Sequence, residues 1–193
     1  MSTINRKLLL HVCCAPCSGG IIEILLQEEF SPDILFYNPN IYPRDEYLRR
    51  KNEISVYAAK NGLMSIDVDH DPDQWVNRVK GLELEPERGR RCQTCFDMRL
   101  ERTALYAHEH GYDLIATTNG ISRWKDISQV SLAGQKAVSK YHYMTFLDRN
   151  WRKDGGMSLM SEVTLREGFY RQDYCGCLYS LKASQIRKKN KTL

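Results

Sequence analysis

Strand-like apolar runs alternate with helical segments along most of this chain, and this alternation restricts its fold more than any other feature. The apolar runs predict strands at 7–12, 33–38, 63–68, 113–118 and 143–148. Helical spacing of apolar residues predicts helices at about 20–29, 44–61, 71–82, 93–110 and 126–140. Strands separated by helices are typical of a mainly parallel sheet with helices on both faces. We therefore expect an α/β fold of this kind.

Length and composition fit one domain without a membrane segment. The 193 residues, 42% of them hydrophobic, suit a single sizeable core. No repeat or linker is visible, and the part from about 150 to 193 is expected to be helical and basic. No apolar run approaches the roughly 20 residues that cross a bilayer, and the N-terminus lacks a signal-peptide cleavage site. We expect a single α/β domain over 1–193, located in the cytoplasm.

Basic side chains gather in three segments, although the net charge is only +4. Two are internal, "RDEYLRRKNE" and "ERGRRC". The third is the C-terminal tail with Arg187, Lys188, Lys189 and Lys191. Such a tail is commonly just a solvated end of the chain, and it also fits attraction to a nucleic-acid phosphate backbone.

The seven cysteines fall into three groups, none of them inside a hydrophobic stretch. The groups are Cys13, Cys14 and Cys17, then Cys92 and Cys95, then Cys175 and Cys177. In a reducing compartment, clustered cysteines bind metal or carry out redox chemistry more often than they form structural disulfides. The first group follows a strand, and parallel strands end at one edge of the sheet, where ligands bind. Polar residues after the other predicted strands, such as Asn38 and Asn119, are expected at the same edge.

The first group precedes Ser18-Gly19-Gly20, which in outline could cradle a phosphate at a helix N-terminus. It resembles the pyrophosphatase loop of ATP-dependent tRNA-thiolating enzymes, Ser-Gly-Gly-x-Asp-Ser. Ile22 and Glu23 replace the Asp and Ser of that pattern, so nucleotide use is doubtful and a plain glycine turn is equally compatible. On an irregular loop, Cys13 and Cys14 can both approach one metal cluster.

The second group is a Cys-x-x-Cys pair at the entrance of a helix, where the two sulfurs share one face. Such a pair holds two corners of a zinc or iron–sulfur site. A structural zinc site normally has two Cys-x-x-Cys arms. The spacing of Cys13-Cys14 and Cys92-x-x-Cys95 is therefore less typical of a zinc site. The four cysteines together still provide a set of four thiolate ligands.

The third group, Cys175-Gly176-Cys177, allows a tight and easily reduced disulfide, because Gly176 lacks a Cβ. The alternative is that both thiols bind a second metal with Asp173. We favour the redox pair.

Three motifs together, "HVCCAPCS", "RCQTCFDMR" and "DYCGC", resemble the epoxyqueuosine reductase QueH family from the first strand to about residue 182. The resemblance implies an oxidoreductase that converts epoxyqueuosine to queuosine at the wobble position of tRNAs with a GUN anticodon, without cobalamin. It implies a Rossmann-like scaffold of the HUP, adenine nucleotide alpha hydrolase-like type. It also implies an electron donor, whose identity the sequence does not give.

The same resemblance assigns roles to six of the cysteines. Cys13, Cys14, Cys92 and Cys95 would bind a [4Fe–4S] cluster, with a second iron beside it as a further option. Cys175 and Cys177 would form a redox-active disulfide, and Cys17 receives no role.

Reducing the epoxide to an alkene with loss of water takes two electrons and two protons, and a dithiol stores two electrons. We therefore expect the Cys175/Cys177 pair to act with the cluster, which would serve as a Lewis acid or electron relay. Asp173 is the candidate acid that protonates the departing oxygen. His11 is second, although a hydrogen-bonded core histidine is the better explanation of it.

The base to be reduced must leave the anticodon stack, so stacking partners are expected. The candidates are Tyr37, Tyr42, Trp124, Tyr170 and Tyr174, most of which should prove to be core residues. Candidates for holding tRNA phosphates are Arg49, Arg50, Arg90, Arg91 and the tail lysines. Two other classes stay open: a PP-loop-like tRNA-thiolating enzyme, and a zinc-binding nucleic-acid module.

Overall fold

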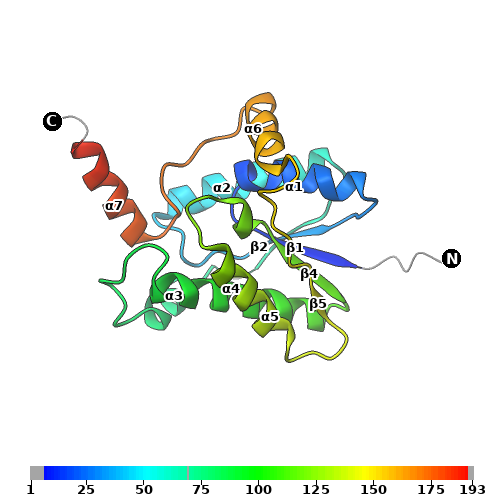
Figure 1. Cartoon of the computed structure of the whole chain (residues 1–193), viewed down its shortest axis with the longest axis horizontal. Coiled ribbons are helices and arrows are strands. Elements are labelled where there is room, and N and C mark those ends of the chain that lie inside the picture. Colours follow the sequence, from blue (N-terminus) through cyan, green and yellow to red (C-terminus); the bar gives the residue numbers. More distant parts are fainter. Residues whose placement is uncertain (1–6, 69, 191–193) are drawn as a thin grey trace.

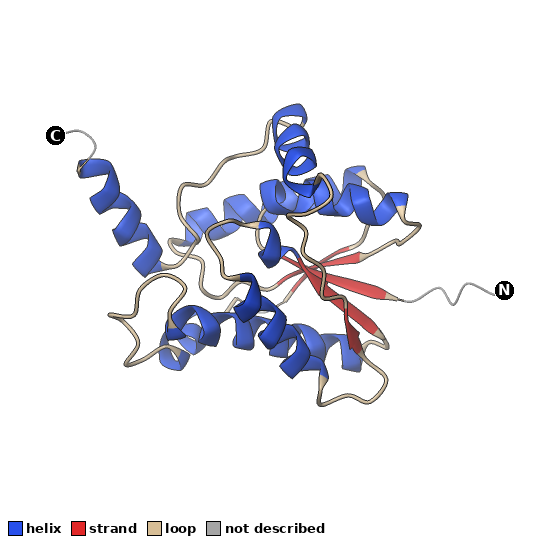
Figure 2. Ribbon diagram, viewed as in Figure 1, coloured by secondary structure: helices blue, strands red, loops and turns tan. Residues whose placement is uncertain are grey.

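A five-stranded, fully parallel sheet forms the centre of the computed structural model, which describes residues 7–68 and 70–190 (Figure 2). The strand order is β3-β2-β1-β4-β5. The strands are β1 (Leu8–Val12), β2 (Asp33–Phe36), β3 (Ser65–Asp67), β4 (Leu114–Thr117) and β5 (Thr145–Phe146). The predicted parallel α/β sheet is confirmed, although β5 is shorter than the predicted run 143–148.

Helices cover both faces of this sheet (Figure 1). One face carries α1 (Ala15–Gln27), α2 (Arg44–Lys60) and α6 (Gly156–Arg166). The other carries α3 (Pro72–Arg78), α4 (Arg90–Glu109) and α5 (Ile127–Val138). A short 3₁₀ helix, η1 (Thr118–Ile121), follows β4, and α7 (Leu178–Lys189) lies to one side of the sheet. Lys191 lies outside the described residues. No helix among the described residues is long and apolar enough to span a membrane.

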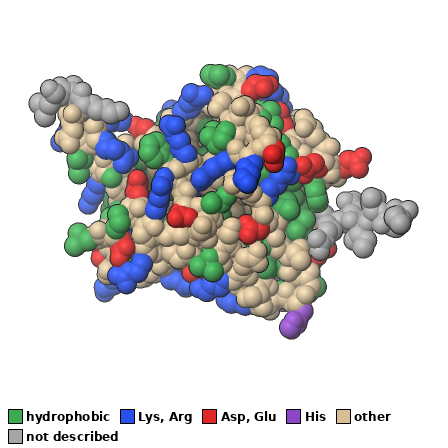
Figure 3. All heavy atoms as spheres, in the orientation of Figure 1, with side chains coloured by type: hydrophobic (Ala, Val, Ile, Leu, Met, Phe, Trp, Pro, Cys, Tyr) green, Lys and Arg blue, Asp and Glu red, His purple; other side chains and the backbone are tan. Residues whose placement is uncertain are grey.

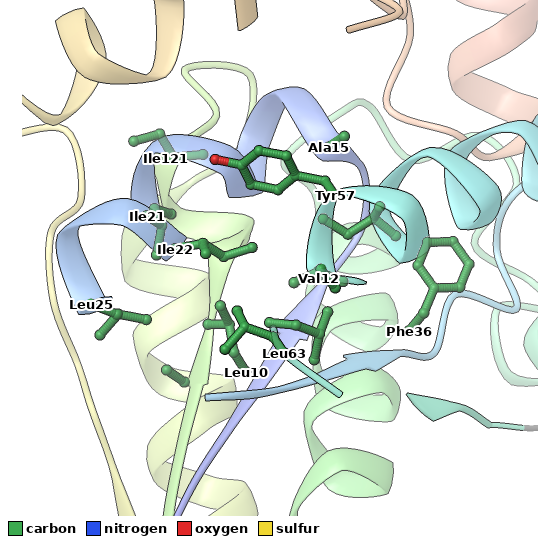
Figure 4. Close-up of a cluster of buried hydrophobic side chains, with 14 of the residues drawn as sticks. Leu10, Val12, Ala15, Ile21, Ile22, Leu25, Phe36, Tyr57, Leu63 and Ile121 are labelled. Carbon is green, nitrogen blue, oxygen red and sulfur yellow. The ribbon is translucent and has the colours of Figure 1, made fainter. Parts of the chain in front are cut away.

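The central strand β1 is apolar at four of its five positions because it is buried on both faces. Leu8, Leu10 and Val12 pack into the core beneath α1 and α2, where Figure 4 shows Leu10 and Val12 beside Ile22. Leu9 points the opposite way into the core beneath α4 and α5. This alternation also directs His11 to the second face.

Helix α1 begins at Ala15, five residues before the predicted start, so Ser18-Gly19-Gly20 lies inside the helix and not in a loop. The two glycines allow a close approach of α6. A Cβ on Gly20 would lie 2.9 Å from the Met160 backbone nitrogen, and one on Gly19 would lie 2.7 Å from Val163 Cγ1. Helix packing therefore explains these glycines, and the suggested phosphate cradle is wrong in its geometry.

We expect Gly20→Ala to destabilise the protein by about 1–3 kcal/mol, the cost of overpacking a tight contact, in spite of the better helix propensity of alanine. The measurement is urea unfolding. Gly120→Ala is the matched control, because its new Cβ would meet no atom closer than 3.8 Å. Equal stability of Gly20→Ala and the wild type would contradict this account of the helix contact.

Candidate metal and redox site

One cavity of about 570 Å³ lies beyond the carboxyl end of β1, between the start of α4, α6 and the segment before α7. Six of the seven cysteines line it: Cys13, Cys17, Cys92, Cys95, Cys175 and Cys177. They come from three segments that are more than 70 residues apart in sequence. Thus the first two cysteine groups come together, as the four-thiolate set requires, and the third group joins them in the same cavity.

The first cysteine group is the tightest of the three. The sulfur atoms of Cys13, Cys14 and Cys17 all lie within 4.8 Å of one another, and those of Cys13 and Cys14 are 3.7 Å apart. Cys14 is the extended residue that precedes α1, and Cys17 lies in the first turn of that helix. Sequence reasoning left Cys17 without a role. The spacing Cys14-x-x-Cys17 at a helix start is the signal that was missed, since Cys92-x-x-Cys95 has the same spacing and also lies at a helix start.

Two nitrogen donors point at this group. The Lys125 ammonium lies 3.6 Å from Cys13 Sγ, and the Gln172 side-chain amide donates to Cys14 Sγ at 2.7 Å. Hydrogen bonds from the Cys14 and Cys17 thiols lower the pKa of Cys13, and the positive charge of Lys125 adds to the effect. The pKa values of Cys14 and Cys17 are raised, chiefly because Cys13 takes the shared charge. The group therefore favours a thiolate at Cys13.

The other four cysteines line the same cavity, and their charges affect one another's pKa values. Burial raises the pKa of Cys92 to about 12, and nearby Cys175, Cys95 and Cys177 contribute to the rise. The pKa of Cys95 is raised in the same way, by burial and by Cys175 and Cys177. Burial also raises the pKa of Cys175, and the charges of Cys177 and Cys13 act in the same direction. Cys175 therefore lies close enough to both Cys177 and Cys13 for their charges to affect its pKa.

The loop that carries Cys175 and Cys177 is held by Arg50. Its guanidinium donates to Cys175 O at 2.9 Å and to Tyr174 O at 3.3 Å, and it pairs with Glu46 at 2.7 Å. Gly176 has a φ of +135°, and a Cβ there would lie 3.1 Å from Arg50 Nη1. Only glycine suits this backbone and this close guanidinium.

Positive charge is buried at the base of the cavity. Arg99 and Lys125 are 2% and 7% exposed, and both donate to Asn119 Oδ1, at 3.3 and 2.7 Å. Arg99 also donates to Asn38 Oδ1 at 2.6 Å, and its Nε has no hydrogen-bond partner among the described residues. Buried cations require counter-charge; Arg99 donates to two neutral amides, and Lys125 donates to Asn119 and to Cys13 Sγ, where a thiolate is favoured. The buried cations Arg99 and Lys125 would balance the charge of an anionic metal site with thiolate ligands. The cysteines offer only sulfur ligands, which suit an iron–sulfur cluster or a zinc ion.

The family model described as "QueH: Epoxyqueuosine reductase QueH" matches residues 8–183 of this chain. Curated relatives with that name include a Haemophilus influenzae protein, 52% identical over 93% of this chain and 74% of its own length. Another, from Thermotoga maritima, is 33% identical over 94% of this chain and 96% of its own. The chain belongs to the epoxyqueuosine reductase QueH family.

The part of the chain that matches the QueH family includes all seven cysteines. Among solved structures, the chain is similar to the U34-tRNA thiolase NcsA from Methanococcus maripaludis with its [4Fe-4S] cluster. The TM-score is 0.55 at 10% identity, covering 100% of this chain and 68% of that one. At this identity the likeness concerns the fold alone, and it agrees with the expected Rossmann-like α/β fold of this QueH-family protein.

Two predicted acids of the QueH-family chain have surroundings that oppose proton donation. His11 is fully buried between Thr117 Oγ1 at 2.8 Å and Tyr37 O at 3.1 Å, and burial lowers its pKa to about 3. It is the hydrogen-bonded core histidine that the sequence favoured. Asp173 lines the cavity, but its carboxylate pairs with Lys188, which lowers its pKa.

Several predicted tRNA-binding residues of this QueH-family chain are structural instead. Arg50 and Arg91 are 1% and 4% exposed, and Arg91 donates to the backbone carbonyls of 82, 83 and 85. Tyr37 and Tyr174 are buried. The assignments of Tyr37 and Arg50 are therefore wrong, because these side chains fill the interior, whereas Arg91 and Tyr174 line the cavity and their assignments stay predictions. Of the remaining aromatic candidates, Tyr170 lies beneath Arg49, with 4.0 Å from the guanidinium carbon to the ring, and Tyr42 and Trp124 are exposed.

Proposed function

We propose that this QueH-family protein reduces epoxyqueuosine to queuosine in tRNA with a dithiol that works beside a metal centre. Membership of the family supports the activity. The observation that carries the mechanism is the meeting of three cysteine segments in one cavity above two buried cations. Ile22 and Glu23 of α1 stand where the pyrophosphatase pattern of thiolating enzymes has Asp and Ser, which disfavours a thiolase.

Cys13, Cys14, Cys92 and Cys95 are our proposed ligands of a [4Fe–4S] cluster. When bound, such a cluster supplies electron transfer one electron at a time. Lys125 and Gln172 are placed to donate hydrogen bonds to the sulfurs of Cys13 and Cys14, which would stabilise them as thiolates. Cys17 is a competing ligand because its sulfur lies within 4.8 Å of those of Cys13 and Cys14. A second iron remains an option for the thiols left over.

Cys175 and Cys177 are our proposed two-electron donor. Both are free thiols in the structure. In the balanced reaction, the two thiols become one disulfide and release two electrons and two protons. The epoxide loses both C–O bonds, its two carbons form a double bond, and the oxygen leaves as water with the two protons. The external electron donor then returns the disulfide to the dithiol.

In this reaction the two thiols supply both protons, so no separate acid is needed. We therefore expect Asp173 not to act as a general acid. Because Lys188 lowers its pKa, the Asp173 carboxyl is ionised near neutral pH and cannot donate a proton there. We expect Asp173→Asn to keep turnover within about threefold of wild type, whereas removal of a general acid costs about 10²- to 10⁴-fold. The turnover of Asp173→Asn is measured as the steady-state rate of reduction of epoxyqueuosine-containing tRNA. A loss on that larger scale, with tRNA binding intact, would restore Asp173 as the acid.

We further propose that the substrate is a tRNA with a GUN anticodon and that the protein acts in the cytoplasm. Support comes from the family and from the basic last turn of α7, with Arg187, Lys188 and Lys189. Phosphate contacts of this kind position a nucleic acid without reading its sequence.

Anaerobic purification tests the whole proposal. Brown protein with iron and sulfide in equal amounts, which converts epoxyqueuosine to queuosine in isolated tRNA, is the expected result. Colourless protein with zinc and no turnover would favour a zinc-binding module, and ATP-dependent thiolation of tRNA would favour a thiolase.

A further inference from the structure

Trp124 is exposed in a way that folding does not explain. Its side chain is 62% exposed, whereas the other two tryptophans, Trp75 and Trp151, are 4% and 2% exposed. It lies in the segment between η1 and α5 and lines the mouth of the cavity that holds the cysteines. Figure 1 shows this segment reaching towards α7 before the chain enters α5. An exposed indole at the mouth of an active-site cavity suggests a ligand.

The loop around Trp124 is fixed by two arginines from other parts of the chain. Arg88 donates to Arg123 O at 2.7 Å and to Trp124 O at 3.2 Å. Arg152 donates to Lys125 O at 2.7 Å and also to Ser122 O. Four consecutive carbonyls are therefore held by side chains, so the loop presents its indole from a fixed backbone.

The same loop reaches the reaction centre on its inner side. Lys125 follows Trp124 directly and extends to 3.6 Å from Cys13 Sγ. Consecutive Cα atoms lie about 3.8 Å apart, so one dipeptide places an aromatic ring at the mouth and a cation at the thiols. A molecule that rests on Trp124 therefore lies at the same cavity that the thiols line.

The charge around Trp124 suits a polyanion. Arg88, Arg123 and Arg171 line the same cavity, and the Arg123 guanidinium lies 5.2 Å from the centre of the Trp124 ring. The acidic residues that line it are largely engaged: Glu87 pairs with Arg187, and Asp173 pairs with Lys188. Figure 3 shows Lys and Arg side chains gathering between α6 and α7 on this face.

We propose that Trp124 is a stacking platform for a nucleobase of the anticodon loop, next to the base that enters the cavity; this rests on the proposed function. Single-stranded bases are held by stacking on aromatic rings and by arginines that contact the backbone. The Trp124 indole at the cavity mouth offers a ring for stacking, and the neighbouring arginines offer contacts to the RNA backbone. The platform is a positioning residue, because it orients the neighbour of the reacting base and does not touch the reacting atoms.

Intrinsic fluorescence and binding of a synthetic anticodon stem–loop RNA test this platform. The wild-type emission should be quenched on binding, and Trp124→Phe should lose most of the quenching, because Trp151 does not line the cavity and Trp75, which lines it, is only 4% exposed. Trp124→Ala should weaken the Kd by about 5- to 150-fold, the scale of one lost stacking contact, and Trp124→Phe by less than about threefold. Leu132→Ala, 60% exposed on α5 and outside the cavity, should leave the Kd unchanged.

The outcomes separate this proposal from the reductase activity. Unchanged stem–loop affinity of Trp124→Ala, with wild-type protein still active on tRNA, would overturn the platform and leave the function standing. If the same variant bound RNA normally but accepted electrons more slowly from a small acidic electron-carrier protein, Trp124 would belong to a donor-docking surface and the platform would again be wrong. Wild-type protein that neither bound the RNA nor reduced the tRNA would remove both proposals.

Discussion

Cys92→Ala and Cys95→Ala proteins, purified anaerobically, are expected to lose most of their iron and sulfide and the brown colour. The proposed cluster has four thiolate ligands, and each variant removes one of the two that lie at the start of α4. A [4Fe–4S] cluster takes one thiolate for each iron, so a missing ligand exposes one corner. Iron and sulfide per chain, together with the visible absorption spectrum, measure the effect.

Cys17→Ala decides between the ligand sets, because the sulfur atoms of Cys13, Cys14 and Cys17 all lie within 4.8 Å of one another. Retained iron in Cys17→Ala, with loss in Cys13→Ala and Cys14→Ala, supports the proposed set. Loss of iron in Cys17→Ala with full retention in Cys92→Ala would show that the first group binds the metal by itself. Cys177→Ala serves as the matched thiol control and is expected to retain its iron.

The sequence was sufficient to predict the parallel sheet, because β1 and β4 are almost entirely apolar, as expected of strands buried on both faces. It was not sufficient to place the start of α1. Gly19 and Gly20 look like a turn until the close backbone of α6, about 140 residues away, is known. Such contacts between distant segments leave no local signal. That residues 1–193 form one domain stays a prediction.

The cysteine groups were equally visible in the sequence, because their spacing is local. The charges that surround them were not. Arg50 and Arg99 resemble surface arginines in their helices, and only the fold shows that one holds the Cys175 carbonyl and the other lies beneath the cavity. Lys125 contacts Cys13 across 112 residues of sequence. Their burial decides their roles, and burial of a single cation cannot be deduced from its neighbours in sequence.

Cys175→Ser and Cys177→Ser are expected to lower turnover of epoxyqueuosine-containing tRNA by about 10³-fold or more, the scale seen when a chemically reacting residue is removed. One remaining thiol cannot form the intramolecular disulfide, so the two-electron step loses its donor. A single turnover without an external donor tests this directly. Wild-type protein should lose two free thiols for each epoxide reduced, and either variant should lose none.

The control for this experiment is Ser180→Ala. Its hydroxyl lies 3.4 Å from Cys177 Sγ and also accepts from Gly176 N, so the variant disturbs the loop but keeps both thiols. It should still lose two thiols per turnover, at a reduced rate. Full activity of Cys175→Ser would remove the dithiol from the mechanism. Arg50 would then hold that loop for another purpose, and electrons would have to reach the substrate from the metal centre alone.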